Sequence, residues 1–342
     1  MKWVTCRAAG MEENTFNTVL WGSAKLSIAP MMDWTDRHCR VFHRLMSRRA
    51  LLYTEMVTAP AIIHGDRRRL LDYDPAEHPL ALQLGGSDPA ELEAATRIAA
   101  DWGYDEINLN VGCPSDRVQS GCFGAVLMKT PDLVADCVAR MLDASPVEVT
   151  VKCRIGVDDQ RPEDVLPAFL DRMRAAGVRR IAIHARKAWL QGLSPRENRD
   201  IPPLDYPLVH RMKGQFPDLH LSINGGIPGL EAARDHLRVM DGVMVGRAAY
   251  HQPWDILGRA DRLWGDAPPF DTPEQVAHAM RPYVVRHLAG GGRLHQITRH
   301  MLGLFHAMPG ARGWKRTLSE GASRGGIEVY DAALRQVARL AA

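Results

Sequence analysis

The sequence lacks the features that mark membrane and secreted proteins. No stretch of its 342 residues approaches the roughly 18 consecutive apolar residues that a membrane-spanning helix needs. The first 25 residues contain Glu12 and Glu13 and no apolar block, so we expect no signal peptide. The six cysteines show no paired Cys-x-x-Cys spacing, which argues against zinc and iron–sulfur sites. Free thiols without a secretion signal point to the cytoplasm.

Composition and charge describe a globular chain with one basic region. Hydrophobic residues make up 46% and charged residues 24% of the sequence, which is enough apolar material for a large core. The net charge is only +3, but the residues from Gly265 onward carry +4 and the preceding ones −1. A basic C-terminal quarter indicates an anionic macromolecular partner, although a solvated helix face would have a similar composition.

Eight short apolar or β-branched runs recur along the chain and predict strands. They are Leu26–Ala29, Leu51–Met56, Leu80–Leu84, Glu106–Val111, Val147–Lys152, Arg180–His184, His220–Ile223 and Asp241–Val245. Helical segments separate them, such as Leu92–Ala100, which follows the helix-start signal at Ser87–Glu91. Eight alternations over roughly 240 residues are typical of a (β/α)8 TIM barrel. A doubly wound open sheet is disfavoured, because no Gly-x-Gly-x-x-Gly turn follows an early strand.

Polar and reactive residues follow the predicted strands at their carboxyl ends. The endings are Pro30-Met31-Met32-Asp33, Glu55-Met56, Gln83-Leu84-Gly85-Gly86, Asn108 to Cys113, Lys152-Cys153-Arg154, His184-Ala185-Arg186, Asn224-Gly225-Gly226 and Gly246-Arg247. Taken singly, His184 could be a hydrogen-bonded core histidine and Lys152 a rim residue with its head in water. Barrel enzymes build their active sites at this end of the strands, so the recurrence predicts an active site there.

The fourth ending carries a cysteine in a rigid turn. Cys113 lies between Gly112, which permits close backbone approach, and Pro114, which fixes the turn. The alternative is a small apolar residue that fills a gap in the core. The flanking Asn108 and Asn110 favour a chemical role for the thiol, since polar strand ends seldom lie beside an inert core cysteine.

The glycines after the last two strands predict a phosphate site. Asn224-Gly225-Gly226 and Gly246-Arg247 are expected to expose backbone N–H groups at helix starts, and Arg247 adds a forked donor. Gln83, Lys152 and His184 would face a planar ring, whose negative charge on reduction a lysine stabilises. Flavin mononucleotide (FMN) fits this set best. Pyridoxal phosphate is the second choice, although it gives Cys113 no obvious task.

Several of these motifs together resemble the tRNA-dihydrouridine synthases. The resemblance runs from about Leu26 into the C-terminal helices. It rests on Ala29–Asp36, Tyr53–Met56, Leu82–Gly86, Asn108–Ser115, Val151–Gly156, Ile183–Arg186, Asn224–Gly226 and Gly246–Arg247. Further stretches resemble the subfamily that acts on uridines 20 and 20a of the tRNA D-loop. They are Thr35–Arg40, His184–Leu190, Ile297–Phe305, Pro309–Arg312 and Trp314–Arg316.

The resemblance implies a reaction and a set of residue roles. Hydride would pass from reduced FMN to C6 of uridine, Cys113 would protonate C5, and NADPH would reduce the flavin. An unperturbed thiol is protonated at neutral pH and can act as an acid. The residues expected to hold the cofactor are Pro30, Met31, Met32, Gln83, Lys152, His184, Asn224, Gly225, Gly226, Gly246 and Arg247.

The resemblance also implies a tRNA surface and a domain plan. Asn110 would help to seat the flipped-out base, and basic residues would contact RNA from two sides of the mouth. These are Arg186, Lys187, Arg196, Arg199, Arg312, Lys315 and Arg316. We expect an N-terminal extension (1–24), an FMN-binding TIM barrel (25–262) and a C-terminal helical tRNA-binding domain (263–342), in a monomer without a metal.

Two other functions are compatible with parts of this pattern. A flavin barrel that reduces a free pyrimidine would share the cysteine and the phosphate loops, but would not need a basic helical C-terminal region. A non-catalytic tRNA-binding or folding factor would share the basic surface. Such a factor would have no use for Cys113, Lys152 and His184 at one rim.

Overall fold

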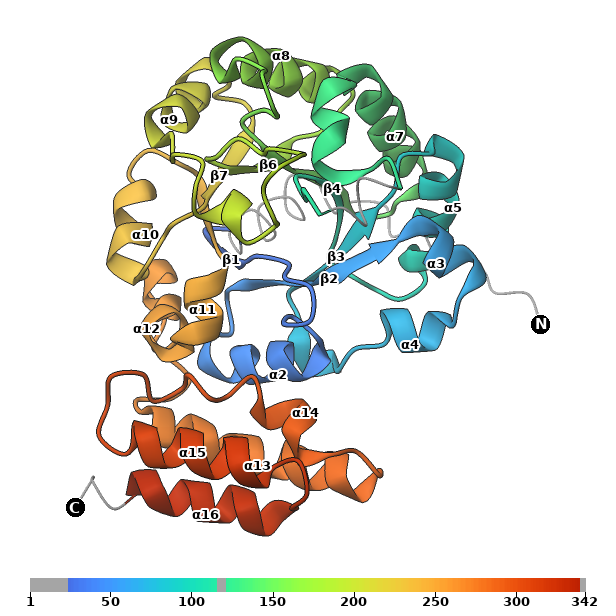
Figure 1. Ribbon diagram of the computed structural model, residues 1–342. Coiled ribbons are helices and arrows are strands. Elements are labelled where there is room, and N and C mark those ends of the chain that lie inside the picture. The colour runs from blue at the N-terminus through green and yellow to red at the C-terminus, as the bar shows by residue number, and fades with distance from the viewer. Residues whose placement is uncertain (1–23, 116–120, 339–342) are drawn as a thin grey trace.

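Eight parallel strands close into a barrel in the computed structural model, which describes residues 24–115 and 121–338 (Figure 1). The strands are β1 (Leu26–Ile28), β2 (Leu51–Thr58), β3 (Leu80–Gly85), β4 (Glu106–Val111), β5 (Glu148–Arg154), β6 (Arg180–His184), β7 (His220–Asn224) and β8 (Gly242–Val245). Each strand pairs with the next in sequence, and β8 returns to β1. The predicted TIM barrel is confirmed, and the bounds of β4 and β6 are those expected from the sequence.

Helices surround the strands, as expected for alternating strand and helix (Figure 1). The α-helices are α2 (Arg37–Met46), α3 (Ala59–His64), α4 (Arg67–Leu71), α5 (Pro89–Ala100), α7 (Pro131–Ala144), α8 (Pro162–Ala175), α9 (Tyr206–Gln215), α10 (Leu230–His236), α11 (Arg247–His251) and α12 (Pro253–Leu257). The 3-10 helices are η1 (Pro75–Glu77), η2 (Gly124–Lys129), η3 (Glu197–Arg199) and η4 (Ala260–Trp264). The predicted start of α5 is confirmed, because the Asp88 carboxylate accepts the N–H groups of Ala90 and Glu91.

Alternate residues of each strand face opposite sides of the barrel wall. On β6, Ile181 and Ile183 belong to the large apolar cluster that includes the surrounding helices. Ala182, between them, packs inside the barrel with residues of other strands. Because successive side chains of a strand point to opposite faces, the inward positions of all eight strands share one small interior.

Four further helices lie beside the barrel, next to α2 and α12 (Figure 1). They are α13 (Pro273–Ala289), α14 (Leu294–Thr298), α15 (Ala311–Gly321) and α16 (Ile327–Ala338). A capping box between Thr272 and Gln275 starts α13. Trp314 is fully buried, and its indole N–H donates to the carbonyl of Met301 at 3.0 Å. The buried apolar residues of these helices belong to the same continuous core as those of the barrel.

The expected domain boundaries fall at the start of the described chain and within η4. The N-terminal extension predicted for residues 1–24 lies outside the described residues, apart from Ala24. The boundary predicted between 262 and 263 lies inside η4, whose Asp261 accepts the backbone N–H of Arg48 at 2.9 Å. None of the helices within 24–115 and 121–338 has the length and the apolar run that a membrane crossing needs.

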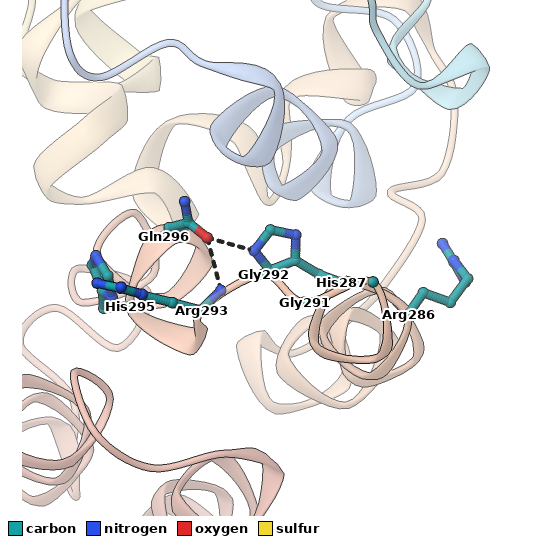
Figure 2. A pocket seen from close by; sticks show the side chains of 8 residues that line it. Arg286, His287, Gly291, Gly292, Arg293, His295 and Gln296 are labelled. Carbon is teal, nitrogen blue, oxygen red and sulfur yellow. Dashed lines mark hydrogen bonds between the residues drawn. The ribbon is translucent and has the colours of Figure 1, made fainter.

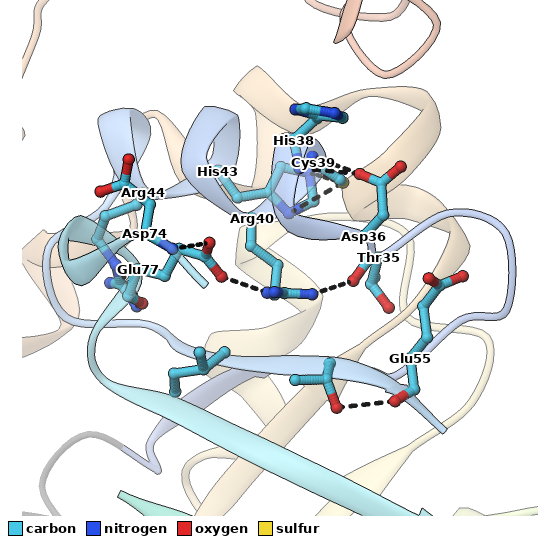
Figure 3. A network of polar contacts seen from close by, with 12 residues as sticks. Thr35, Asp36, His38, Cys39, Arg40, His43, Arg44, Glu55, Asp74 and Glu77 are labelled. Atoms are coloured by element: carbon cyan, nitrogen blue, oxygen red, sulfur yellow. Dashed lines mark hydrogen bonds and ion pairs between the residues drawn. The ribbon is translucent and has the colours of Figure 1, made fainter. Parts of the chain in front are cut away.

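The first turn of α2, drawn in Figure 3 with its Asp36 cap, contacts the C-terminal helices. The Asp36 carboxylate caps α2 by accepting two backbone N–H groups. It also accepts bonds from Arg299 (2.6 Å) and His300 (3.0 Å), which follow α14. Burial alone would raise the pKa of Asp36, but the hydrogen bond and charge of His300, the cap and Arg299 hold it well below its usual range. Asp36 is therefore ionised at neutral pH and attracts both partners.

A second set of contacts fixes the other side of α2 (Figure 3). Arg40 and Glu77 form a buried ion pair, and Arg40 also donates to the carbonyl of Thr35 at 2.7 Å. The hydroxyl of Thr35 accepts the backbone N–H of Met31 at 3.0 Å. The buried guanidinium of Arg40 thus holds Thr35, and Thr35 in turn holds the segment that follows β1.

We predict that Asp36→Asn loosens the C-terminal helices. The substitution keeps an acceptor at the helix start but removes the charge that attracts Arg299 and His300. The free energy of unfolding should fall by about 1–2 kcal/mol, the low end for bonds to a charged group, because Arg299 is partly exposed. Chemical denaturation measures this loss.

The matched control for this prediction is Asp331→Asn. Asp331 accepts from Arg281 at 2.7 Å, and both residues lie within the C-terminal helices. Limited proteolysis should cleave between the barrel and the C-terminal helices faster in the Asp36 variant than in the control. Equal cleavage rates in the two variants would show that Asp36 does not hold these helices to the barrel.

Candidate active site at the carboxyl ends of the strands

Strand register brings the predicted polar residues into one ring at the carboxyl ends. Lys152 lies opposite Asn110 on the neighbouring strand, and His184 lies opposite Asn224. The Gln83 amide accepts a bond from the Asn110 amide at 2.8 Å. Five predicted residues on five different strands therefore meet around the same opening, as the strand endings indicated.

The turn after β4 is held by side chains on both sides. The Asn110 side-chain oxygen accepts the backbone N–H groups of Gly112 (3.0 Å) and Cys113 (2.9 Å). From β5, the Arg154 guanidinium donates to the carbonyl of Gly112 at 2.9 Å. The Cys113 thiol lies 3.5 Å from the hydroxyl of Ser115 and is partly exposed. A fixed backbone thus presents an accessible thiol at the rim, which a buried gap-filling cysteine would not do.

Positive charge surrounds this thiol. Burial and the neighbouring Arg154 lower the pKa of Lys152 to about 8. Burial, followed by Arg154 and Lys152, holds the pKa of His184 well below its usual range. At neutral pH the site therefore contains a protonated Lys152 and a neutral His184. A positive charge and a neutral ring with one N–H donor suit an electron-rich planar ligand.

The two glycine loops differ from each other in structure. Gly225 has φ +109°, and a Cβ there would lie 2.6 Å from the His184 ring, so only glycine fits beside that imidazole. The expected helix start follows β8, where α11 begins at Arg247, but it does not follow β7, where α10 begins only at Leu230. The expectation of a helix start after Gly226 is therefore wrong, because five residues separate the strand from its helix.

Two of the predicted phosphate-site side chains already have protein partners. The Asn224 amide donates to the carbonyl of Met244 at 2.7 Å, which ties β7 to β8. Arg247 forms a 2.6 Å ion pair with Asp200, from the loop between β6 and α9. Both members of this pair are partly exposed. An anion at this loop would thus meet Arg247 together with a competing carboxylate.

The segment after β1 approaches the loop after β8. Met31 exchanges backbone and side-chain bonds with Thr35, and its sulfur lies about 3.8 Å from where a Cβ of Gly246 would be. Pro30 is partly buried, and 51% of Met32 is exposed. The three residues expected to line the flavin therefore border the same opening from the β1 side.

The basic residues predicted to contact RNA form two groups. In the loop after β6, which crosses the barrel opening in Figure 1, Arg186 donates to the carbonyl of Pro202 and Lys187 lies 5.2 Å from the Trp189 ring centre. Arg196 and Arg199 of this loop are exposed. The second group, on α15, consists of the exposed residues Arg312, Lys315 and Arg316.

One residue of the basic group on α15, Lys315, and Arg247 at the barrel rim both affect the pKa of His251. Burial, and after it Arg247 and Lys315, lower the pKa of His251. Lys315 of the C-terminal helices and Arg247 of the barrel rim are therefore both near the same side chain at the end of α11. The carbonyl of His251 also lies about 2.1 Å from where a Cβ of Gly303 would be, so only a glycine allows this approach of the two backbones.

A basic hollow on the C-terminal helices was not predicted from the sequence (Figure 2). It has a volume of about 540 Å³ and lies at the turn between α13 and α14. Arg286, Arg293, His287 and His295 contribute to its lining, and His287 bonds to Gln296 at 2.9 Å. None of its lining residues belongs to a barrel strand.

Two residues that organise the site were not selected from the sequence. Arg154 donates to the carbonyls of Lys187 and Asn198, both at 2.9 Å, besides that of Gly112. Asn198 is fully buried and donates to the carbonyl of Trp189 at 2.8 Å. Arg154 stands in the predicted polar ending Lys152-Cys153-Arg154, at the two-residue period of a strand, but the sequence assigned it no role. Asn198 lies in a loop, and no local pattern marks it.

Comparison with known proteins shows the family of this chain. The profile of the family described as dihydrouridine synthase matches residues 27–339. This chain belongs to the dihydrouridine synthase family.

In the part of the chain that the structure describes, no group of three or more His, Cys, Asp or Glu residues is placed to hold a metal ion.

Several family members are similar over nearly their whole length. Two curated relatives named tRNA-dihydrouridine(20/20a) synthase come from Escherichia coli (strain K12) and Salmonella typhi. They are 56% and 58% identical to this chain, covering 97% and 92% of it and 96% and 95% of the relatives. The relative of the same name from Xanthomonas axonopodis pv. citri (strain 306) is 55% identical over 92% of this chain and 94% of its own.

A solved structure shares the barrel. The old yellow enzyme homologue from Zymomonas mobilis matches with a TM-score of 0.50 and 13% identity, over 67% of this chain and 86% of that one. At this identity the likeness concerns the fold alone, and it agrees with the TIM barrel described above.

We predict that Gly225→Ala disturbs His184. The new methyl group would overlap the imidazole, and alanine disfavours a φ of +109°, so the free energy of unfolding should fall by about 1–3 kcal/mol. Thermal or chemical denaturation measures the loss, and the His184 ring signals in NMR spectra should shift. Gly214→Ala in α9, where no atom lies within 4 Å, is the control and should be neutral or slightly stabilising. Equal stability of both variants would contradict the close packing.

Proposed function

We propose that this protein reduces uridine to 5,6-dihydrouridine at positions 20 and 20a of the tRNA D-loop, with FMN as cofactor and NADPH as electron donor. The observation that carries the proposal is the fixed turn that presents Cys113 at the same rim as Lys152 and His184, in a chain more than half identical to relatives named for this activity. A tRNA substrate would place the protein in the cytoplasm.

The residues at the rim fit a flavin. Gln83 is buried with one amide proton committed to Asn108, so a second N–H is available to a ring carbonyl. Lys152 supplies positive charge, and Gly225 leaves room for the His184 ring. Met31, Pro30 and Met32 would cover the ring, while Asn224, Gly225, Gly226, Gly246 and Arg247 would hold the tail. Reduced FMN would supply a hydride to C6 of the uracil.

Cys113 would supply the proton that completes the reduction. Hydride addition at C6 leaves negative charge at C5, and the Cys113 thiol would donate its proton there, so the C5=C6 bond becomes a single bond. The turn holds the sulfur through backbone bonds to Asn110 and Arg154. Asn110 would also border the base, while its side-chain oxygen holds the turn.

The two basic groups would hold the tRNA backbone on either side of the opening. Arg186, Lys187, Arg196 and Arg199 would act from the loop after β6, and Arg312, Lys315 and Arg316 from α15. The target base must leave its stack to reach the thiol, so contacts around the opening suit a flipped nucleotide. We propose residues 25–262 as the catalytic barrel and 263–342 as the tRNA-binding domain.

The function is tested with tRNA from a strain that lacks the modification. Purified protein, FMN and NADPH should convert uridine 20 or 20a to dihydrouridine, as measured by nucleoside mass analysis and mapping. Conversion of free uridine at an equal rate would support a free-pyrimidine reductase instead. A colourless protein that binds tRNA but oxidises no NADPH would support a non-catalytic binding factor.

We predict that Cys113→Ala separates the two halves of the reaction. The variant should bind flavin and tRNA and should accept electrons from NADPH normally, because the thiol takes no part in those steps. Oxidation of the reduced flavin by tRNA should slow by about 10²-fold or more, the usual worth of a positioned acid. Stopped-flow absorbance measures both rates, and Cys122→Ala is the control. An unchanged rate of oxidation by tRNA would rule out Cys113 as proton donor.

We predict that α15 contributes phosphate contacts. Replacing Arg312 and Lys315 with Ala should weaken tRNA binding and lower the salt slope of the affinity by about 1–2, one for each lost contact. Flavin content and NADPH oxidation should stay normal, because the barrel rim is untouched. Affinity measured over a range of salt concentrations tests this.

The control for this prediction removes the same charge from the same group of helices. Replacing Arg286 and Arg293 with Ala takes two cations from the hollow at the α13–α14 turn. A loss confined to the α15 variant assigns the binding face to α15. An unchanged slope in the α15 variant would instead leave the RNA contacts to the loop that holds Arg196 and Arg199.

A further inference from the structure

A chain of hydrogen bonds crosses the barrel interior from the start of β4 to the Cys113 turn. The Thr150 hydroxyl bonds to the Glu106 carboxylate at 2.5 Å, and the Asn108 amide donates to Thr150 at 2.7 Å. The Gln83 amide then donates to Asn108, and the Asn110 amide to Gln83, both at 2.8 Å. The chain ends where Asn110 accepts the backbone N–H groups of the turn. All five side chains are buried.

The charge of Glu106 fixes the direction of every bond in this chain. Glu106 is fully buried and forms an ion pair with Arg180, so it stays ionised and can only accept hydrogen bonds. The Tyr53 hydroxyl donates to the same carboxylate oxygen at 2.6 Å. The Thr150 hydroxyl must therefore donate its single proton to Glu106, and it accepts a hydrogen bond from Asn108.

The three amides then have only one consistent orientation. An amide can point either end at a neighbour, and the network alone decides which end it presents. Because Thr150 accepts, Asn108 turns its NH₂ toward it and its oxygen toward Gln83. Gln83 in turn donates to Asn108 and accepts from Asn110. Asn110 is left with its oxygen toward the turn, which is the only end that can accept two backbone N–H groups.

We propose that Thr150 and Asn108 are positioning residues for Cys113, and that Glu106 sets the direction of the chain through which they act. This rests on the proposed function, in which Cys113 is the proton donor. Loss of the Thr150 hydroxyl leaves the Asn108 NH₂ without an acceptor in the chain and allows the amides to reverse. A reversed Asn110 presents NH₂ to the N–H groups of the turn, which no longer hold the thiol in place.

The experiment uses Thr150→Val, which keeps the size and branching of the side chain and removes only the hydroxyl. Thr150→Ser restores the hydroxyl and should rescue. Ser222→Ala is the matched control, because Ser222 lines the same small interior cavity as Thr150 but is not a member of the chain. Asn108→Ala interrupts the chain at a second point and serves if the valine variant does not fold.

The first readout does not depend on enzymatic activity. Peptide mass spectrometry of full-length protein gives the alkylation rate of Cys113 relative to exposed Cys122 in the same molecule. We expect this ratio to change by more than about twofold in Thr150→Val and Asn108→Ala, because a thiol's reactivity follows its surroundings. The ratio should stay at its wild-type value in Thr150→Ser and Ser222→Ala.

The second readout is tRNA-dependent turnover. We expect kcat to fall about 10-fold or more in Thr150→Val with KM for tRNA nearly unchanged, as for a misplaced catalytic group. The thermal stability of each variant is measured in parallel, so that a general loss of folding is distinguished from a local displacement of Cys113. A Cys113 ratio and kcat in Thr150→Val equal to those of Thr150→Ser would overturn the proposal. A changed Cys113 ratio in Thr150→Val, together with no activity of the wild-type protein on tRNA, would instead refute the proposed function and leave the hydrogen-bond chain in place.

Discussion

The alternation of side chains along parallel strands is the constraint on which this site depends. In a closed barrel, every second residue of each strand points into one narrow interior, and those nearest the carboxyl ends meet at one opening. Gln83, Asn110, Lys152, His184 and Asn224 each occupy such a position. A shift of one residue in any strand would move its polar residue into the apolar layer under the helices. The apolar outward positions therefore fix the polar inward ones.

Charge is arranged along the barrel axis. The Glu106–Arg180 pair lies at the start of the strands, and Lys152, Arg154 and His184 lie near their carboxyl ends. Both members of the lower pair are buried, so the charge of each is compensated by the other. Burial, and after it Arg154 and Lys152, hold the pKa of His184 well below its usual range. Burial and Arg154 lower the pKa of Lys152 only to about 8, so it keeps its charge at neutral pH. The site is thus electropositive at its opening, where the proposed ring and RNA are both electron-rich.

The C-terminal helices depend on the barrel for their placement, and the barrel rim depends on them in turn. Asp36 caps α2 and also accepts from Arg299 and His300, so a single carboxylate fixes both elements. At the same helix start, the hydroxyl of Thr35 accepts the backbone N–H of Met31 at the rim. A displacement of the C-terminal helices would therefore shift α2 and, through Thr35, the segment after β1. This coupling relates the proposed RNA-binding surface to the proposed cofactor site.

The sequence alone determined the fold and most of the rim. Strand periodicity and turn residues are local signals, so the eight strands, the α5 cap and the Cys113 turn could all be predicted. Tertiary structure decided which partners these residues have. Asn108 and Thr150 are ordinary strand residues until closure of the barrel places them between Glu106 and Gln83. Likewise, only the path of the loop after β6 brings Asp200 to Arg247. Such pairings depend on contacts between segments far apart in the chain, and no local pattern of residues specifies them.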